Sequence, residues 1–206
     1  FPDTEIIDQM TKVFYESDYD IGKLMRFVFS SDWFYEERFI GCKIASPVEL
    51  LVRLRRLTGM YFSEDKAQIE LQKVLGQVLL FPPNVAGWKG GRNWIDASSL
   101  LVRLSIPKVM LDGTGLELKA KPQFEEEGKP DPKKVKIKVV WSKLLDQFKG
   151  IEDDEIEEEM RAGLIQSPDD RIDKGVLRSK IDRSSRDKRI VSTAVAFMST
   201  PEFQLI

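Results

Sequence analysis

The chain has 206 residues, a formal net charge of −2, 42% apolar residues, 32% charged residues and no histidine. This length and composition are typical of a soluble globular protein with a real core, and the near-neutral charge does not favour nucleic acid as a partner. No apolar run approaches the roughly 18 residues of a membrane span, and the lack of histidine excludes a Ser-His-Asp triad or a His-bearing zinc site within these residues.

The first part of the chain repeats apolar residues at helical spacing. Asp3 or Thr4 can cap a first helix, and Asp20 can cap a second one. The segment from Ser46 to Glu49 is a capping box with proline at the first helical position, and Gly59 is the expected end of the helix that it opens.

Two further helices are predicted before the pattern changes. The first begins after Ser63, carries an apolar stripe as far as Leu79 and ends at Pro82. The second begins at Asp96, and we expect Pro107 to end it because proline lacks the N–H that a helix interior needs.

Residues 107–140 are predicted to be an insertion with a β-hairpin. Leu116 to Ala120 and Lys134 to Val139 alternate apolar and charged residues, which is the period of a strand with one apolar face. An isolated hairpin is marginal in water, so this face should lie on the helical body. Helices resume at about Trp141. The fold class expected is mainly α: a multi-helix globular bundle with a small two-stranded antiparallel hairpin, in a single domain over 1–206.

Residues 82–94, here called the Gly–Trp loop, combine two prolines, three glycines and two tryptophans. Trp88 and Trp94 could offer flat apolar faces to a ligand such as a glycan. Alternatively, the rings are buried and anchor the loop to the core. Of the two, we expect Trp88 to be chiefly structural and Trp94 to be nearer to solvent. The candidate ligand-binding residues are Asn84, Trp88, Arg92, Asn93, Trp94 and Asp96.

Two charged stretches are weaker candidates. The acidic run from Glu152 to Glu159 lacks the spacing of an EF-hand, so a solvated helix start is favoured over a Ca²⁺ site. The basic stretch from Arg171 to Arg189 is interleaved with aspartates, which favours a salt-bridged face over a phosphate site. We expect no metal and no cofactor.

The Gly–Trp loop also carries a family resemblance. Its residues 82–88, Gly90-Gly91 and the following Trp94-Ile95 resemble the signature of the bacterial family called domain of unknown function 1800. Similar pieces are Tyr19-Asp20-Ile21, Ser46-Pro47-Val48-Glu49-Leu50 and Ser199-Thr200-Pro201-Glu202-Phe203-Gln204. Since the family's proteins are longer, the chain resembles their C-terminal part. The resemblance implies a mostly helical domain of bacterial proteins that are often exported, hence a periplasmic or secreted location, and it implies no catalytic residues.

Two hypotheses of function follow. The leading one is a non-catalytic binding or interaction module of an exported bacterial protein, linked to extracellular polysaccharide, with a glycan or a protein as its partner. The alternative is a carboxylate-dependent hydrolase whose site is completed by a missing N-terminal region. A cleft that holds two carboxyl groups with raised pKa would favour the enzyme.

Overall fold

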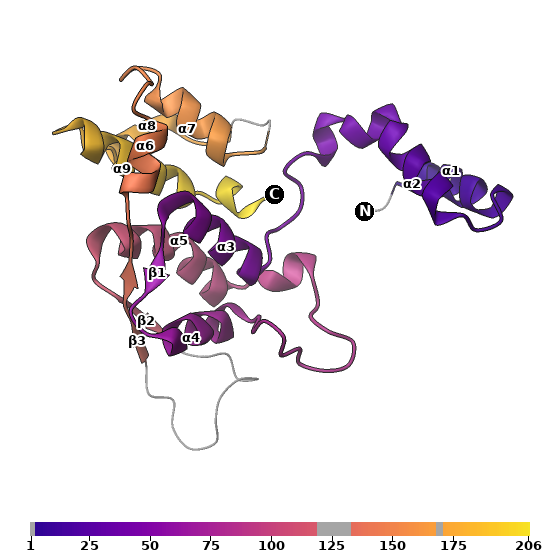
Figure 1. Ribbon diagram of the computed structural model, residues 1–206, viewed down its shortest axis with the longest axis horizontal. Coiled ribbons are helices and arrows are strands. Elements are labelled where there is room, and N and C mark those ends of the chain that lie inside the picture. Colours follow the sequence, from indigo (N-terminus) through magenta and orange to yellow (C-terminus); the bar gives the residue numbers. More distant parts are fainter. Residues whose placement is uncertain (1–2, 119–132, 168–170) are drawn as a thin grey trace. The chain divides into compact units, whose positions relative to one another are not determined.

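A computed structural model describes residues 3–118, 133–167 and 171–206, and these are mainly helical, as the sequence predicts (Figure 1). Contacts group the chain into two compact units, residues 1–42 and 43–206. That these units form a single domain stays a prediction. Within the described ranges, no helix has the length and apolar character needed to cross a membrane.

The first unit consists of two helices and two short 3₁₀ turns. The Asp3 carboxylate accepts hydrogen bonds from the N–H groups of Glu5 and Ile6, and the Asp20 carboxylate accepts one from Lys23, so both predicted caps are confirmed. Among the described residues of this unit, no large apolar side chain is buried. The elements are α1 (Thr4–Glu16), α2 (Ile21–Ser30), η1 (Asp32–Tyr35) and η2 (Glu37–Phe39).

The second unit opens with α3 (Pro47–Thr58), whose two ends are as predicted. The Ser46 hydroxyl accepts from the N–H of Glu49 at 3.3 Å, and the Glu49 carboxylate accepts from the N–H of Ser46 at 2.7 Å. Gly59 ends the helix at φ +68°, and a Cβ there would lie 3.1 Å from the carbonyl oxygen of Val140. Only glycine satisfies both conditions without strain.

The next helix, α4 (Asp65–Leu75), is shorter than its apolar stripe predicts. Glu64 rather than Ser63 precedes it, and the helix stops well before Pro82. Gly76 adopts φ +93°, and its N–H donates a hydrogen bond to the carbonyl of Gln72, which is the usual way in which a glycine ends a helix. The stripe residues beyond Gly76, including Leu79, therefore belong to a loop.

The prediction that Pro107 ends a helix is wrong. Asp96 caps α5 (Ala97–Asp112) as expected, but the helix continues through Pro107 and stops at Gly113. Proline removes one helical N–H and its ring crowds the carbonyl four residues earlier, but the turn after it buries Val109 and Met110 in the core. This tertiary packing compensates for the lost backbone hydrogen bond, so residues 107–112 of the expected insertion are helical.

Four short strands form two small antiparallel sheets in the described part of the chain. β2 (Leu116–Leu118) pairs with β3 (Lys133–Val135), which confirms the predicted two-stranded pair. β4 (Ile137–Lys138) pairs instead with β1 (Tyr61–Phe62), a strand that the sequence analysis did not predict. Val135 and Ile137 are buried, so the apolar face lies on the helical body as expected. The remainder of the predicted hairpin, residues 119–132, lies outside the described residues.

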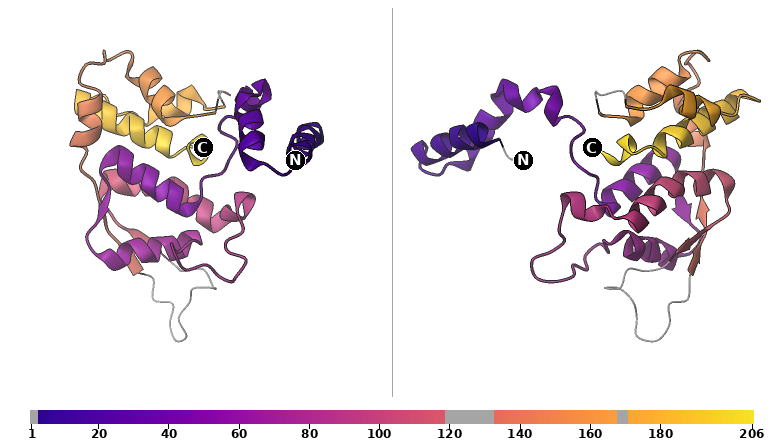
Figure 2. Two further views of the ribbon diagram at one scale, coloured as in Figure 1. Left: turned by 45° about the vertical axis from the view of Figure 1, so that its right-hand side comes forward. Right: turned by 180° about the vertical axis from the view of Figure 1, so that it is seen from behind.

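The C-terminal helices pack around α9 (Arg186–Met198) (Figure 2). Every residue of α9 from Ile190 to Met198 is buried. It contacts α5 and each of the three helices before it. The backbone then returns to the start of the unit, where the N–H of Ala45 donates to the carbonyl of Gln204 at 2.8 Å. The other elements are α6 (Ser142–Gln147), α7 (Ile156–Leu164), α8 (Lys174–Ser179) and η5 (Glu202–Gln204).

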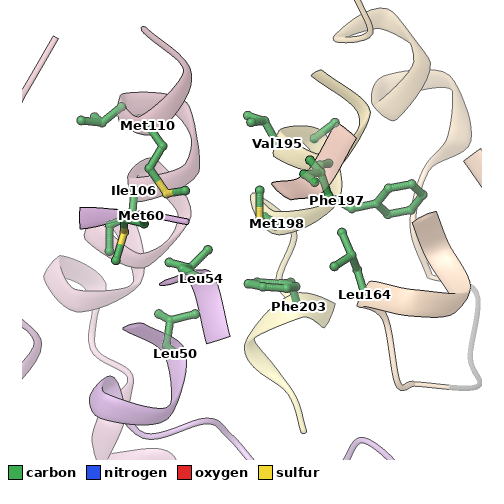
Figure 3. Close-up of a cluster of buried hydrophobic side chains, with 14 of the residues drawn as sticks. Leu50, Leu54, Met60, Ile106, Met110, Leu164, Val195, Phe197, Met198 and Phe203 are labelled. Atoms are coloured by element: carbon green, nitrogen blue, oxygen red, sulfur yellow. The ribbon is translucent and has the colours of Figure 1, made fainter. Parts of the chain in front are cut away.

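The core of this unit joins segments that are far apart in the sequence. Figure 3 shows Leu50 and Leu54 of α3 and Ile106 of α5 facing Met198 of α9 and Phe203 of η5. Each of these five side chains is buried. Burial of large apolar side chains is the main driving force of folding, so this cluster holds the body from which the Gly–Trp loop extends.

Candidate binding site

The Gly–Trp loop begins after a tight turn that leaves α4. The N–H of Leu79 donates to the side-chain oxygen of Gln72 at 2.8 Å, and the N–H of Phe81 donates to the carbonyl of Val78 at 3.0 Å. Leu80 occupies the left-handed region at φ +63°. We call residues 78–81 the apolar turn. Its hydrogen bonds tie the start of the loop to the buried end of α4.

Short side-chain contacts give the loop a defined shape. The Asn84 side-chain oxygen accepts from the N–H of Ala86 at 2.9 Å, and the Asn84 carbonyl accepts from the N–H of Gly87 at 3.0 Å. The Asn93 side-chain amide donates to the carbonyl of Gly90 at 2.9 Å, at the start of η3 (Gly91–Trp94). Asparagine favours such local turns because its short amide reaches the neighbouring backbone. Two of the predicted site residues therefore also hold the loop together.

The prediction that Trp94 is more exposed than Trp88 is wrong. Trp94 is 8% exposed, and its carbonyl accepts a hydrogen bond from the hydroxyl of Ser99 at the start of α5. Trp88 is only half-buried, and its Nε1 has no hydrogen-bond partner among the described residues. Gly91 adopts φ +61° at the start of η3, and this turn brings Trp94 next to the start of α5. The buried Trp94 ring therefore anchors the loop to the core, and the Trp88 ring is the more exposed of the two.

A hollow of about 330 Å³ lies beside this loop. Four of the six candidate residues line it: Asn84, Trp88, Asn93 and Trp94. The other described lining residues are Leu75, Gly76, Pro83, Gly87 and Lys89. The hollow combines two aromatic rings, two amides and one ammonium group, and no carboxylate is present among its described lining residues. This is the mixture of apolar surface and a few placed polar groups that small polar ligands require.

The remaining two candidates do not join this hollow. Asp96 accepts from the N–H of Ser99 at 2.8 Å as the cap of α5. Arg92 is exposed and does not line the hollow. Lys89 was missed by the sequence analysis, although its place between Trp88 and Gly90 in the same loop could have indicated it.

The acidic run and the basic stretch bind each other. Glu157 accepts from Arg178 at 2.8 Å and from Arg183 at 3.4 Å. Asp153 pairs with Arg186 and, at 3.5 Å, with Arg189. The salt-bridged face predicted for the basic stretch is therefore present, and these carboxylates are occupied by arginines. Among the described residues, no group of three potential ligand side chains could hold a metal ion.

Arg186 adds a structural role to this cluster. Its Nη2 donates to the carbonyls of Phe148 and Ile151, so one guanidinium joins the end of α6 to the start of α9. Asp169 and Asp170, the two aspartates directly before the basic stretch, lie outside the described residues.

The carboxyl groups whose pKa is shifted do not form a catalytic pair among the described residues. The hydrogen bond from Lys43 lowers the pKa of Glu49, and backbone hydrogen bonding at Ser184 lowers the pKa of Asp182. Lowered pKa values keep both groups ionised at neutral pH, so neither is suited to donate a proton there. Glu49 also belongs to the cap of α3, which explains its interactions structurally.

The comparisons with known proteins agree with the resemblance seen in the sequence. Neither the curated proteins nor the solved structures give a match. The model of a family described as a protein of unknown function, DUF1800, matches residues 1–205. Because this match covers essentially the whole chain, the protein belongs to the DUF1800 family.

Proposed function

We propose that the protein is a non-catalytic binding module and that the hollow beside the Gly–Trp loop takes a polar ligand such as a glycan. The observation that carries this proposal is the gathering of Trp88, Asn84 and Asn93 around one hollow of about 330 Å³. Aromatic rings bind the apolar faces of sugars, while amides exchange hydrogen bonds with hydroxyl groups.

Trp88 is the central residue of the proposed site. It is half-buried, so one part of the ring is held by the loop while another part remains accessible. Its Nε1 is buried and has no hydrogen-bond partner among the described residues, so the accessible part of the ring, and not the indole N–H, is what Trp88 offers to a ligand in the hollow. Lys89 adds a positive charge to the same lining.

The composition of the hollow favours binding over the hydrolase alternative. A carboxylate-dependent hydrolase needs two acids at the scissile bond, and the hollow has none among its described lining residues. The exported setting and the link to extracellular polysaccharide rest on the family resemblance and are part of the proposal.

A glycan array followed by titration of tryptophan fluorescence tests this function. We expect binding of a subset of saccharides, with affinity reduced about tenfold or more in Trp88→Ala, which removes the aromatic ring from the lining of the hollow. Lys89→Ala should also weaken binding. The matched control is Lys108→Ala, because Lys108 is an exposed lysine of α5 outside the lining. Equal binding by all these variants would refute the assignment of the hollow.

A further inference from the structure

The apolar turn presents large hydrophobic side chains to solvent. Leu80 is 89% exposed and Phe81 is 65% exposed, and Leu79 and Val85 are exposed as well. None of these four residues lines the hollow, so the proposed ligand does not explain them. Neighbouring exposed apolar side chains mark an interaction surface, since water penalises their exposure.

The backbone of this turn indicates that the leucine side chain itself matters. Leu80 adopts φ +63°, a region in which a side chain crowds the backbone and which glycine enters freely. The turn would form more easily with glycine at this position. A strained, exposed leucine in this turn therefore points to a function of the side chain rather than to the needs of the fold.

Positive charge accompanies the exposed apolar residues. The sequence contains no aspartate or glutamate from Leu71 to Ile95, whereas Lys89 and Arg92 are exposed. In the part of the chain that the structure describes, neither Lys89 nor Arg92 has an ion-pair partner, while Lys73 is paired with Glu70. The loop thus combines apolar side chains with two cations that are free to meet an anionic surface.

We propose that the apolar turn, together with Val85, Lys89 and Arg92, docks the protein on an anionic lipid surface. Leu80 and Phe81 enter the interface between headgroups and acyl chains, and the two cations contact the headgroups. Anionic lipids attract juxtamembrane Lys and Arg, and buried apolar groups add to this attraction.

The shape of the loop favours lipid over an acidic protein partner. Figures 1 and 2 show the segment between α4 and η3 extending away from the body of the second unit, and its apolar side chains are exposed. A protein partner would need a preformed pocket for this protruding segment, whereas a bilayer deforms around it. Lys89 belongs both to this surface and to the lining of the hollow, whereas Leu80 and Arg92 do not line the hollow. Variants at Leu80 and Arg92 therefore test the lipid proposal separately from the proposed ligand site.

Vesicle sedimentation with the whole chain tests the proposal. The probes are vesicles of phosphatidylcholine alone and vesicles with about 30% phosphatidylglycerol. We expect binding to the anionic vesicles, weaker binding to the neutral ones, and a loss of binding at high salt. Leu80→Gly should reduce partitioning about tenfold or more, because several apolar carbons leave the interface. Its melting temperature should stay the same or rise, since the strain at φ +63° is relieved.

Two further variants complete the design. Arg92→Gln should weaken binding to the anionic vesicles and leave the weak binding to the neutral ones unchanged. Val176→Ala is the control, because Val176 is an exposed apolar residue of α8, and it should bind like the wild type. Binding to polyglutamic acid that does not depend on Leu80 would indicate an acidic protein partner and overturn the proposal. So would an absence of vesicle binding, or wild-type binding by Leu80→Gly.

Discussion

Arg103 donates a hydrogen bond from Nη1 to the side-chain oxygen of Gln204, 3.4 Å away, although 101 positions separate the two residues. The same nitrogen donates to the carbonyl of Ala45 at 3.0 Å. Arg103 has no exposed surface, and Gln204 is also buried. One guanidinium therefore ties α5 to both ends of the second unit, where the segment before α3 meets the C-terminal turn.

The first prediction concerns the size of the side chain at this position. Arg103→Ala should destabilise the protein by about 3–5 kcal/mol, because it leaves a cavity and two unpaired polar groups. Arg103→Met should cost clearly less, since methionine fills most of the volume and removes a buried charge. Urea unfolding of both variants measures the difference. Equal losses would mean that the hydrogen bonds, and not the filled volume, account for the cost.

The second prediction is a pH dependence that comes from the same residue. Burial lowers the pKa of Arg103 to about 10, opposed by the charge of Asp96. The folded state then releases this proton near pH 10, while the unfolded state keeps it to higher pH. The unfolded state binds more protons in that window, so the wild type should gain stability relative to Arg103→Met between pH 9 and 11. Denaturant midpoints at both pH values check the sign; a relative loss of stability would contradict the assigned shift.

The third prediction concerns the two tryptophans of the Gly–Trp loop. Trp94→Ala should cost about 3–5 kcal/mol, because Trp94 is buried. Trp88→Ala should cost clearly less, because that ring is only half-buried. Thermal unfolding monitored by circular dichroism ranks the two variants. The reverse order would restore the expectation drawn from the sequence and would weaken the assignment of Trp88 to the proposed site.

The fourth prediction tests the role of the β-strands in the core. Ile137→Ala should destabilise the protein by about 2–4 kcal/mol, since Ile137 is buried in the strand that pairs with β1. Lys136→Ala is the matched control, because the neighbouring lysine is exposed, and its effect should remain within about 0.5 kcal/mol. Two similar melting temperatures would show that the strands contribute little to the core.

The fifth prediction concerns metal ions. Millimolar Ca²⁺ should raise the melting temperature little, because arginines occupy the carboxylates of Asp153 and Glu157. Differential scanning calorimetry with and without Ca²⁺ measures this effect. A stabilisation above about 2 kcal/mol, close to that expected at one hundred times the dissociation constant, would reveal a site that these ion pairs do not block.

Local sequence was sufficient for the helix ends that depend on near neighbours. Asp3, Asp20, Ser46 and Asp96 were each identified as caps, because a cap bonds N–H groups only two or three residues away. The period-two alternation likewise identified the strand pair, and Val135 and Ile137 are buried as that alternation requires.

Tertiary structure decided whatever depends on distant residues. Pro107 remains inside a helix because core packing beyond it outweighs one lost backbone hydrogen bond. Trp94 is buried next to the start of α5, and Asp153 meets Arg186 across 33 positions of sequence. The sequence by itself determined the helical class, the caps and the family. Burial, ion pairing and the hollow depend on which distant side chains share a space, and only the folded chain brings these together.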